Sequence, residues 1–199
     1  MTVPALGQVL SSPALDTRYR THLRLVRADA EDAAYICRLR GDPKLNRFLN
    51  VADVQLEAQL AWLVDYKRRE AAGEEFYFVI MCDGAPAGLV RMYDFREAYG
   101  ARSFCWGSWI IPKPRPNGLV VYSVLLVYEI GFDTLGFEQS HFDVRRGNVG
   151  VLAFHNRAGA TRVSSDDENA YFTYDPAAYR AFREANQGQV EQHRILSGG

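Results

Sequence analysis

The stretch that most constrains the fold is residues 109–132, where a strand runs into a proline-rich loop that opens a helix. The loop, residues 112–118, reads PKPRPNG, and a strongly apolar segment, residues 119–132, follows it. Such a loop presents unpaired backbone N–H groups and the positive end of a helix dipole, which together bind a pyrophosphate. Lys113 and Arg115 add cationic side chains for phosphate oxygens. Taken alone, the loop fits an anion site and a plain connection with solvated charges equally well.

The elements around this loop predict an α+β protein with a mixed sheet. Turn residues at Asp83-Gly84 and Tyr99-Gly100 separate three aromatic and β-branched runs, which is typical of an antiparallel meander. The second helix is expected to present a stripe of Leu56, Leu60, Leu63, Val64 and Lys67, flanked by Trp62 and Tyr66. In chain order we expect a strand at 22–28, a helix from Asp29 or Asp32 to Gly41, a helix from Asp53 to near Gly73, strands at 75–82, 86–93 and 102–111, a helix at 119–132, a strand at 140–145, a helix from Asn148 to Ala158, strands near 160–164 and 170–174, and a helix from Asp175.

The length and composition indicate one globular domain. A chain of 199 residues with 48% hydrophobic and 24% charged residues supports a single sizeable core. The first 22 residues contain prolines and serines and no continuous apolar stretch, so we expect a loosely held arm outside the core. We divide the chain into an N-terminal arm at 1–22, a single domain at 23–185 and a C-terminal tail at 186–199.

Charge and cysteine content narrow the class of partner. The 23 basic and 24 acidic residues give a net charge of -1, so no global field attracts nucleic acid or an anionic membrane, and an anion site must be local. No apolar run approaches the roughly 20 residues that cross a bilayer. Cys37, Cys82 and Cys105 lie in apolar segments and are interpreted as reduced, buried thiols of a cytoplasmic protein.

A second motif, residues 142–160, reads FDVRRGNVGVLAFHNRAGA and carries a family resemblance. A strand, a turn with Asn148, a helix carrying Phe154-His155 and a closing Gly159 together resemble the pattern of the GNAT acyltransferases. The glycine supplies a left-handed C-terminal cap. The resemblance covers about residues 23–174 and implies a mostly antiparallel central sheet with a splayed parallel strand pair, flanked by helices. The chain departs from the family at Val120, where the phosphate loop usually has a small residue.

The resemblance implies acetyl-CoA as co-substrate and no metal. In this family the pantetheine arm enters between two splayed parallel strands, which correspond here to residues 104–111 and 140–144. Ile110 and Ile111 would supply backbone contacts to it. The other expected cofactor-binding residues are Lys113, Arg115, Asn117, Gly118, Leu119 and Asn148. Asn148 is also expected to cap the following helix with its side chain.

The resemblance also places candidate catalytic residues. His155 stands where the family often has a tyrosine that protonates the departing thiolate, and a histidine can do this near neutral pH. A histidine packed under the helix with one hydrogen bond is the alternative. Asp94 and Ser108 are the candidates for a general base, which an alkyl ammonium needs to lose its proton. Asp94 fits a turn residue equally well.

The expected substrate is a small-molecule amine. Residues 39–43 and 47–49 resemble acetyltransferases that act on nucleotide-linked amino sugars, and the ribosomal-protein N-terminal acetyltransferases are the runner-up. Arg40 would contact a diphosphate, and Trp106, Trp109 and Tyr93 would form a flat aromatic pocket wall or simply fill the core. A non-catalytic GNAT-fold module that binds coenzyme A is a third reading. The expected partners include no nucleic acid and no membrane, with a homodimer left open.

Overall fold

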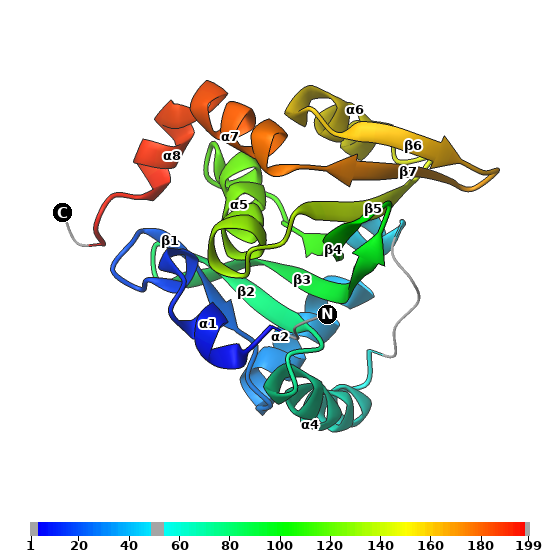
Figure 1. Cartoon of the computed structure of the whole chain (residues 1–199). Helices are drawn as coiled ribbons and strands as arrows, with labels where there is room; N and C mark the ends of the chain where they lie inside the picture. The colour runs from blue at the N-terminus through cyan, green and yellow to red at the C-terminus, as the bar shows by residue number, and fades with distance from the viewer. Residues whose placement is uncertain (1–3, 49–53, 198–199) are drawn as a thin grey trace.

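Seven β-strands form one sheet at the centre of the protein, and helices cover both of its faces (Figure 1). The computed structural model describes residues 4–48 and 54–197. The predicted helix start at Asp53, and Leu49 of the substrate motif, lie outside these residues. The elements are α1 (Leu6–Leu10), the 3-10 helix η1 (Pro13–Leu15), β1 (Thr21–Leu25), α2 (Ala30–Gly41), α3 (Pro43–Asn46), α4 (Leu56–Ala71), β2 (Phe76–Cys82), β3 (Ala85–Ala98), β4 (Ala101–Ile110), α5 (Leu119–Tyr128), the π-helix η2 (Glu129–Thr134), β5 (Gln139–Arg145), α6 (Val149–Ala158), β6 (Thr161–Ser165), β7 (Asn169–Tyr174), α7 (Pro176–Ala185) and α8 (Gln187–His193).

The strand order confirms the predicted mixed sheet. The strands lie in the order β1-β2-β3-β4-β5-β7-β6, and every neighbouring pair is antiparallel except β4 and β5, which run parallel. A parallel neighbour needs a crossover, and the chain makes it through the loop at 112–118 and α5. The predicted loop therefore sits at the point where the meander ends and the parallel pair begins.

Side chains of β2 alternate between two cores, because successive residues of a strand point to opposite faces. Phe76, Phe78 and Ile80 pack in the cluster under α5, and Tyr77 and Val79 pack against α2 and α4. Figure 1 shows α2 and α4 together on one side of the sheet and α5 crossing the other side. Both faces are buried, which explains why this strand is hydrophobic at almost every position.

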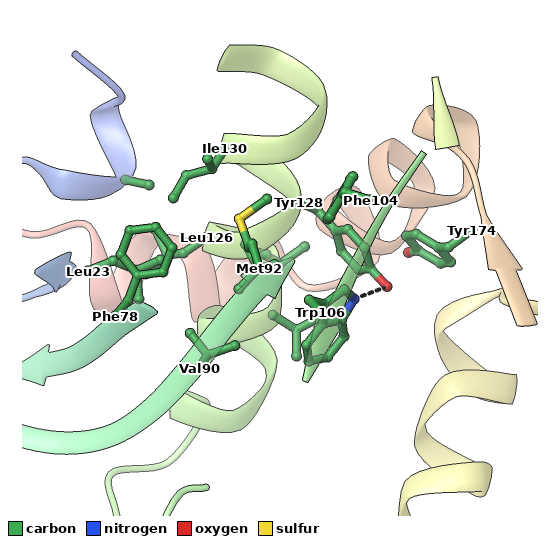
Figure 2. Close-up of a cluster of buried hydrophobic side chains, with 14 of the residues drawn as sticks. Leu23, Phe78, Val90, Met92, Phe104, Trp106, Leu126, Tyr128, Ile130 and Tyr174 are labelled. Atoms are coloured by element: carbon green, nitrogen blue, oxygen red, sulfur yellow. Dashed lines mark hydrogen bonds between the residues drawn. The ribbon is translucent and has the colours of Figure 1, made fainter. Parts of the chain in front are cut away.

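Aromatic side chains fill the larger core, between the sheet and α5 (Figure 2). Tyr128 of α5 stacks on Tyr174 of β7 with ring centroids 4.4 Å apart. The indole N–H of Trp106 donates to the Tyr128 hydroxyl at 3.2 Å, so this buried polar group is satisfied. α5 also contacts α7 and α8, which explains why it is apolar all round.

The predicted helix at 119–132 does not continue as one α-helix. It changes at Glu129 into a π-helix that ends at Thr134. Gly131 lies in this segment against Phe104 of β4, and a Cβ there would come within 2.2 Å of the Phe104 ring. The absence of a side chain at Gly131 therefore permits close approach of the segment to the sheet.

The two ends of the chain pack against the domain, so the expectation that residues 1–22 lie outside the core is wrong. Val9 and Ala14 are buried in the larger core, and Thr21 already belongs to β1. At the other end, His193 of α8 is fully buried. Its ring lies 2.9 Å from the Thr21 hydroxyl and 2.9 Å from the Asn117 carbonyl of the proline-rich loop.

The face that α4 buries also differs from the predicted stripe. Leu63 of the predicted stripe and the flanking Tyr66 are buried, together with Glu70, whereas Leu56 and Val64 of the stripe are exposed. The polar members of this face are satisfied, because the Tyr66 hydroxyl donates to Glu70 and accepts from the backbone N–H of Tyr77 at 2.7 Å. The stripe was placed partly to one side of the buried face, because hydrophobicity gives no weight to a buried glutamate.

Gly131→Ala should destabilise the protein by about 1–3 kcal/mol, because the added methyl group overpacks against the Phe104 ring. Gly150→Ala in α6 is the matched control, since nothing lies within 4 Å of the Cβ it would add. We expect that control to be neutral or slightly stabilising. Urea denaturation measures both; equal stability of the two variants would contradict the close packing of η2 on β4.

Candidate active site

A cavity opens where β4 and β5 separate. The two strands pair only at Ser103 with Gln139 and at Phe104 with Ser140, and no further pair follows toward their carboxyl ends. A cavity of 390 Å³ lies in this splay. Its described lining residues are Arg40, Phe48, Arg91, Tyr93, Cys105, Trp106, Gly107, Ser108, Trp109, Phe142, Asp143, Val144, Arg145, Asn148, Val151, His155 and Asn169.

Two β-bulges shape the strands beside the cavity. Between the pairs Arg91–Gly107 and Leu89–Ile110, β4 has one more residue than β3, and Ser108 in this bulge has a φ of 49°. A second bulge lies on β3 at Asp94, whose φ is 52°. Both predicted base candidates thus occupy left-handed bulge positions. Bulges bend a strand and redirect its side chains, and they are common next to active sites.

The bulge at Ser108 explains how Trp106 and Trp109 come together. In a regular strand, residues three apart point to opposite faces, but here the two rings touch with centroids 5.6 Å apart. Their planes stand at 74°, so the predicted flat aromatic wall is wrong. The indole of Trp109 donates to Ser123 of α5 at 3.1 Å, and the indole of Trp106 donates to Tyr128 of the same helix. Both rings belong to the core and present only part of their surface to the cavity.

The cavity has a polar side that faces α2. Strand alternation and register put Arg91 and Tyr93 of β3, Cys105 of β4 and Asp143 of β5 on the sheet face opposite to Trp106 and Phe142. Arg40, near the end of α2, reaches this side and donates to Ser108 Oγ at 3.4 Å. The predicted substrate residues Arg40 and Tyr93 therefore do lie in one cavity with Ser108.

Asp94 lies outside the described lining of the cavity, because its carboxylate is engaged elsewhere. It accepts from Arg96 at 2.8 Å and contacts His141 Nε2 at 2.9 Å, and the other nitrogen of His141 lies 2.8 Å from Ser103 Oγ. Burial raises the pKa of Asp94, but the hydrogen bonds from Arg96 and His141 outweigh it and hold the pKa below its usual value. These hydrogen bonds link β3, β4 and β5. Because they occupy the carboxylate of Asp94, they do not favour Asp94 as a base.

His155 sits among aromatic rings at the α6 side of the cavity. It is 3% exposed and contacts the rings of Trp106, Phe142 and Phe154, with centroids 4.3–5.6 Å from its own. Desolvation lowers the pKa of His155 to about 4. Such an imidazole is neutral near pH 7, which favours the packed histidine over the general acid. None of the described residues hydrogen bonds to its ring, so the hydrogen bond expected in that alternative is not found.

The proline-rich loop ends in a glycine with left-handed backbone at the start of α5. Gly118 has a φ of 79° and is the N-terminal cap residue. The Leu119 N–H bonds to the Pro116 carbonyl at 3.3 Å, whereas the described residues supply no acceptor for the N–H groups of Val120 and Val121. These groups fit a phosphate, and Val120 has ordinary helical backbone. Lys113 and Arg115 are exposed beside them, and Arg115 also donates to the Ile111 carbonyl at 3.1 Å.

Asn148 lines the cavity and does not cap α6 with its side chain, contrary to expectation. Its carbonyl accepts from the Leu152 N–H at 3.0 Å, so only its backbone starts the helix. The side chain is thereby left facing the splay. Gly159 ends α6 in the predicted left-handed conformation, with a φ of 91°.

A protein-family model for the acetyltransferase (GNAT) domain matches residues 20–161. The chain belongs to the GNAT acetyltransferases. Among solved structures it is similar to apo FdhC, a nucleotide-linked sugar GNAT, with 43% identity, a TM-score of 0.74, and coverage of 90% of this chain and 97% of FdhC. No curated protein matches the chain in sequence.

Two more distant GNAT structures show the same fold in complex with coenzyme A species. RimJ of Mycobacterium smegmatis with CoA-disulfide has 16% identity and a TM-score of 0.68, covering 90% of this chain and 94% of RimJ. Spermidine N-acetyltransferase of Vibrio cholerae with CoA and spermine has 15% identity and a TM-score of 0.66, covering 81% of this chain and 98% of that one.

As a GNAT enzyme, the protein transfers an acetyl group from acetyl-CoA to an amine. The splayed parallel pair of the GNAT fold is the one predicted, β4 with β5. Within the described residues, no helix is long and apolar enough to span a membrane, and no group of three His, Cys, Asp or Glu residues is placed to hold a metal. Sequence reasoning missed Arg91 and Asp143, which strand alternation and register could have placed beside Tyr93.

The resonance of the His155 ring should stay unchanged between pH 8 and pH 5 and should move only near pH 4, because burial keeps the imidazole neutral. Proton NMR of the C2–H resonances measures this, and His155→Leu identifies the signal. A midpoint near 6.5 would contradict the packed, neutral histidine and restore the general-acid role.

The same residue should make stability depend on pH. Below pH 6.5 the unfolded chain protonates at this position, whereas the folded chain does so only near pH 4. Stability is therefore lost as the pH falls from 6.5 to 4, by up to about 3 kcal/mol. In urea denaturation at pH 7 and pH 4.5, His155→Leu should show a smaller loss than the wild-type protein.

Proposed function

We propose that this enzyme acetylates the primary amine of a nucleotide-linked amino sugar, with acetyl-CoA as the donor. The observation that carries the proposal is the pair of guanidinium groups, Arg40 and Arg91, on the polar side of the cavity. An anionic group of the substrate would meet both, and a diphosphate offers oxygens for two guanidiniums at once. The amine would then approach the splay from the α2 side.

Arg91 is well suited to an anion. It pairs with Glu75, and its guanidinium lies 5.1 Å from the centroid of the Tyr93 ring. Its Nε is buried without a hydrogen-bond partner among the described residues, an arrangement that usually costs free energy. Burial and the neighbouring charges of Arg69 and Arg40 lower its pKa. A bound phosphate would supply the missing acceptor and offset the repulsion between the arginines.

Acetyl-CoA would approach from the sheet face opposite to Arg40 and Arg91. The residues around Trp109, Val151 and His155 are largely apolar, and the N-terminus of α5 with its free N–H groups lies on this side of the sheet. We infer that Val120, Val121, Lys113, Arg115 and Asn148 hold the pyrophosphate and pantetheine of coenzyme A. Direct attack between the two faces needs no covalent intermediate on the protein.

The similarity to FdhC supports this choice of substrate. FdhC is a nucleotide-linked sugar GNAT, and the match at 43% identity covers nearly the whole of both chains. The protein N-terminal acetyltransferase alternative would be favoured by an acidic peptide groove. The described cavity lining instead has three arginines and one aspartate, so it does not favour that alternative.

The deciding experiment is calorimetric titration with acetyl-CoA followed by a thiol-release assay on a panel of amines. The panel holds UDP- and dTDP-linked amino sugars, the same sugars without the nucleotide, and N-terminal peptides. Turnover restricted to nucleotide-linked sugars supports the proposal. Turnover of peptides alone would replace it with the second function, and failure to bind millimolar acetyl-CoA would leave the non-catalytic module.

Arg40→Ala should raise the KM for a nucleotide-linked amino sugar by about 10- to 100-fold, as expected for the loss of a charged hydrogen bond to phosphate. The KM for the free amino sugar should stay nearly unchanged, because that substrate lacks the diphosphate. Steady-state kinetics on both substrates measures the difference. Arg38→Ala, an exposed neighbour on α2 outside the cavity, is the matched control. Equal losses on both substrates would contradict diphosphate recognition by Arg40.

A further inference from the structure

Asp143 of β5 is the only acidic residue among the described residues that line the cavity. Its side chain is exposed to the splay, on the same sheet face as Tyr93 and Cys105. No described residue donates a hydrogen bond to its carboxylate or forms an ion pair with it. An unpaired carboxylate inside a cavity is ready to receive a cation from outside the protein.

The other carboxylates near the cavity are already engaged. Glu75 pairs with Arg91 and with Arg69, and Glu168 pairs with Arg145. Asp94, as described above, is held by Arg96 and His141. Asp143 therefore differs from its neighbours, because it forms no ion pair with any cation among residues 4–48 and 54–197, although three arginines line the same cavity.

The groups that face Asp143 are neutral or occupied. Burial raises the pKa of Cys105 to about 12 and raises the pKa of Tyr93, so both keep their protons near neutral pH. Tyr171 of β7, which pairs with Asp143 in the sheet, donates its hydroxyl hydrogen bond to Asp166 at 2.6 Å. Arg145, two residues along β5, is held by Glu168, and the buried His155 of α6 is neutral. None of these groups supplies a cation to Asp143, so a substrate ammonium can approach its carboxylate.

We propose that Asp143 is a catalytic residue that binds the ammonium group of the substrate and accepts one proton from it. The proposal rests on the acetyl transfer and amine substrate of the proposed function. Arg91 of β3 and Asp143 of β5 are separated by β4, and both lie near the Tyr93 ring, so the cavity has a carboxylate on one strand and a guanidinium two strands away, with Arg40 close to Arg91. This separation fits an amine linked through an uncharged ring to a diphosphate.

The ammonium loses a proton to the Asp143 carboxylate, and the free amine forms a C–N bond with the thioester carbonyl carbon. The C–S bond then breaks, and its electron pair leaves with sulfur. The second proton passes from nitrogen to the thiolate, which gives the amide and free coenzyme A. Because Asp143 is exposed, it returns the first proton to water.

Asp143→Asn tests the proposal, since it keeps the shape and removes the charge. With the nucleotide-linked amino sugar as substrate, we expect kcat/KM at pH 7 to fall by about 100- to 1,000-fold. Part of the loss should be recovered above pH 9, where a larger fraction of the substrate amine is already neutral. Acetyl-CoA affinity by calorimetry and the thermal midpoint should remain those of the wild-type protein. Asp65→Asn, an exposed carboxylate on α4 outside the cavity, is the matched control.

Retention of kcat/KM within about threefold at pH 7 would overturn the proposal, since general-base catalysis contributes far more than that. A loss that stays constant from pH 6 to pH 9.5, or that comes with weaker acetyl-CoA binding, would overturn it too, because either result indicates a structural role. Failure of the proposed function is a separate result. If the wild-type protein acetylates a different amine of the panel, the substrate is wrong, and the same comparison of Asp143→Asn is made on that amine.

Discussion

The separation of β4 from β5 is the constraint on which the site depends. Backbone groups of a sheet interior normally pair with the next strand, yet these two strands share only two residue pairs before they part. A hydrogen-bonded chain from Ser103 through His141 to Asp94 ties three strands together where the pairing stops. Beyond it the sheet is open to both faces, so a polar reactant and an acyl donor can meet between strands without either crossing a packed core.

Much of the fold could be predicted from local patterns. Turn chemistry and periodicity predict the helix cap at Asp29, the left-handed Gly159 and the apolar α5. Each of these features depends on residues that are close together in the sequence. The parallel pairing of β4 with β5 came from resemblance to a family. Periodicity alone does not say which strands become neighbours.

The rest could not be predicted, because it depends on contacts between distant residues. Ser108 and Asp94 have a positive φ although neither is a glycine. The sequence therefore has no glycine at these positions that would have indicated the two bulges. Asp94 was therefore predicted as a base, although Arg96 and the distant His141 already occupy its carboxylate. Asp143 was overlooked because a lone carboxylate on a strand carries no motif. Its significance arises only when strand pairing places it on the same sheet face as Tyr93, in the cavity that the arginines line.

The burial of His193 bears on how the protein is made. Its ring joins β1, near the beginning of the chain, to the carbonyl of Asn117 in the loop that opens α5. Asn117 precedes His193 by 76 residues, so during synthesis this bond cannot form until α8 has left the ribosome. α8 therefore stabilises the loop at the start of α5 only after the sheet has been synthesised, and a variant truncated before α8 would keep the sheet but lose this contact to the loop.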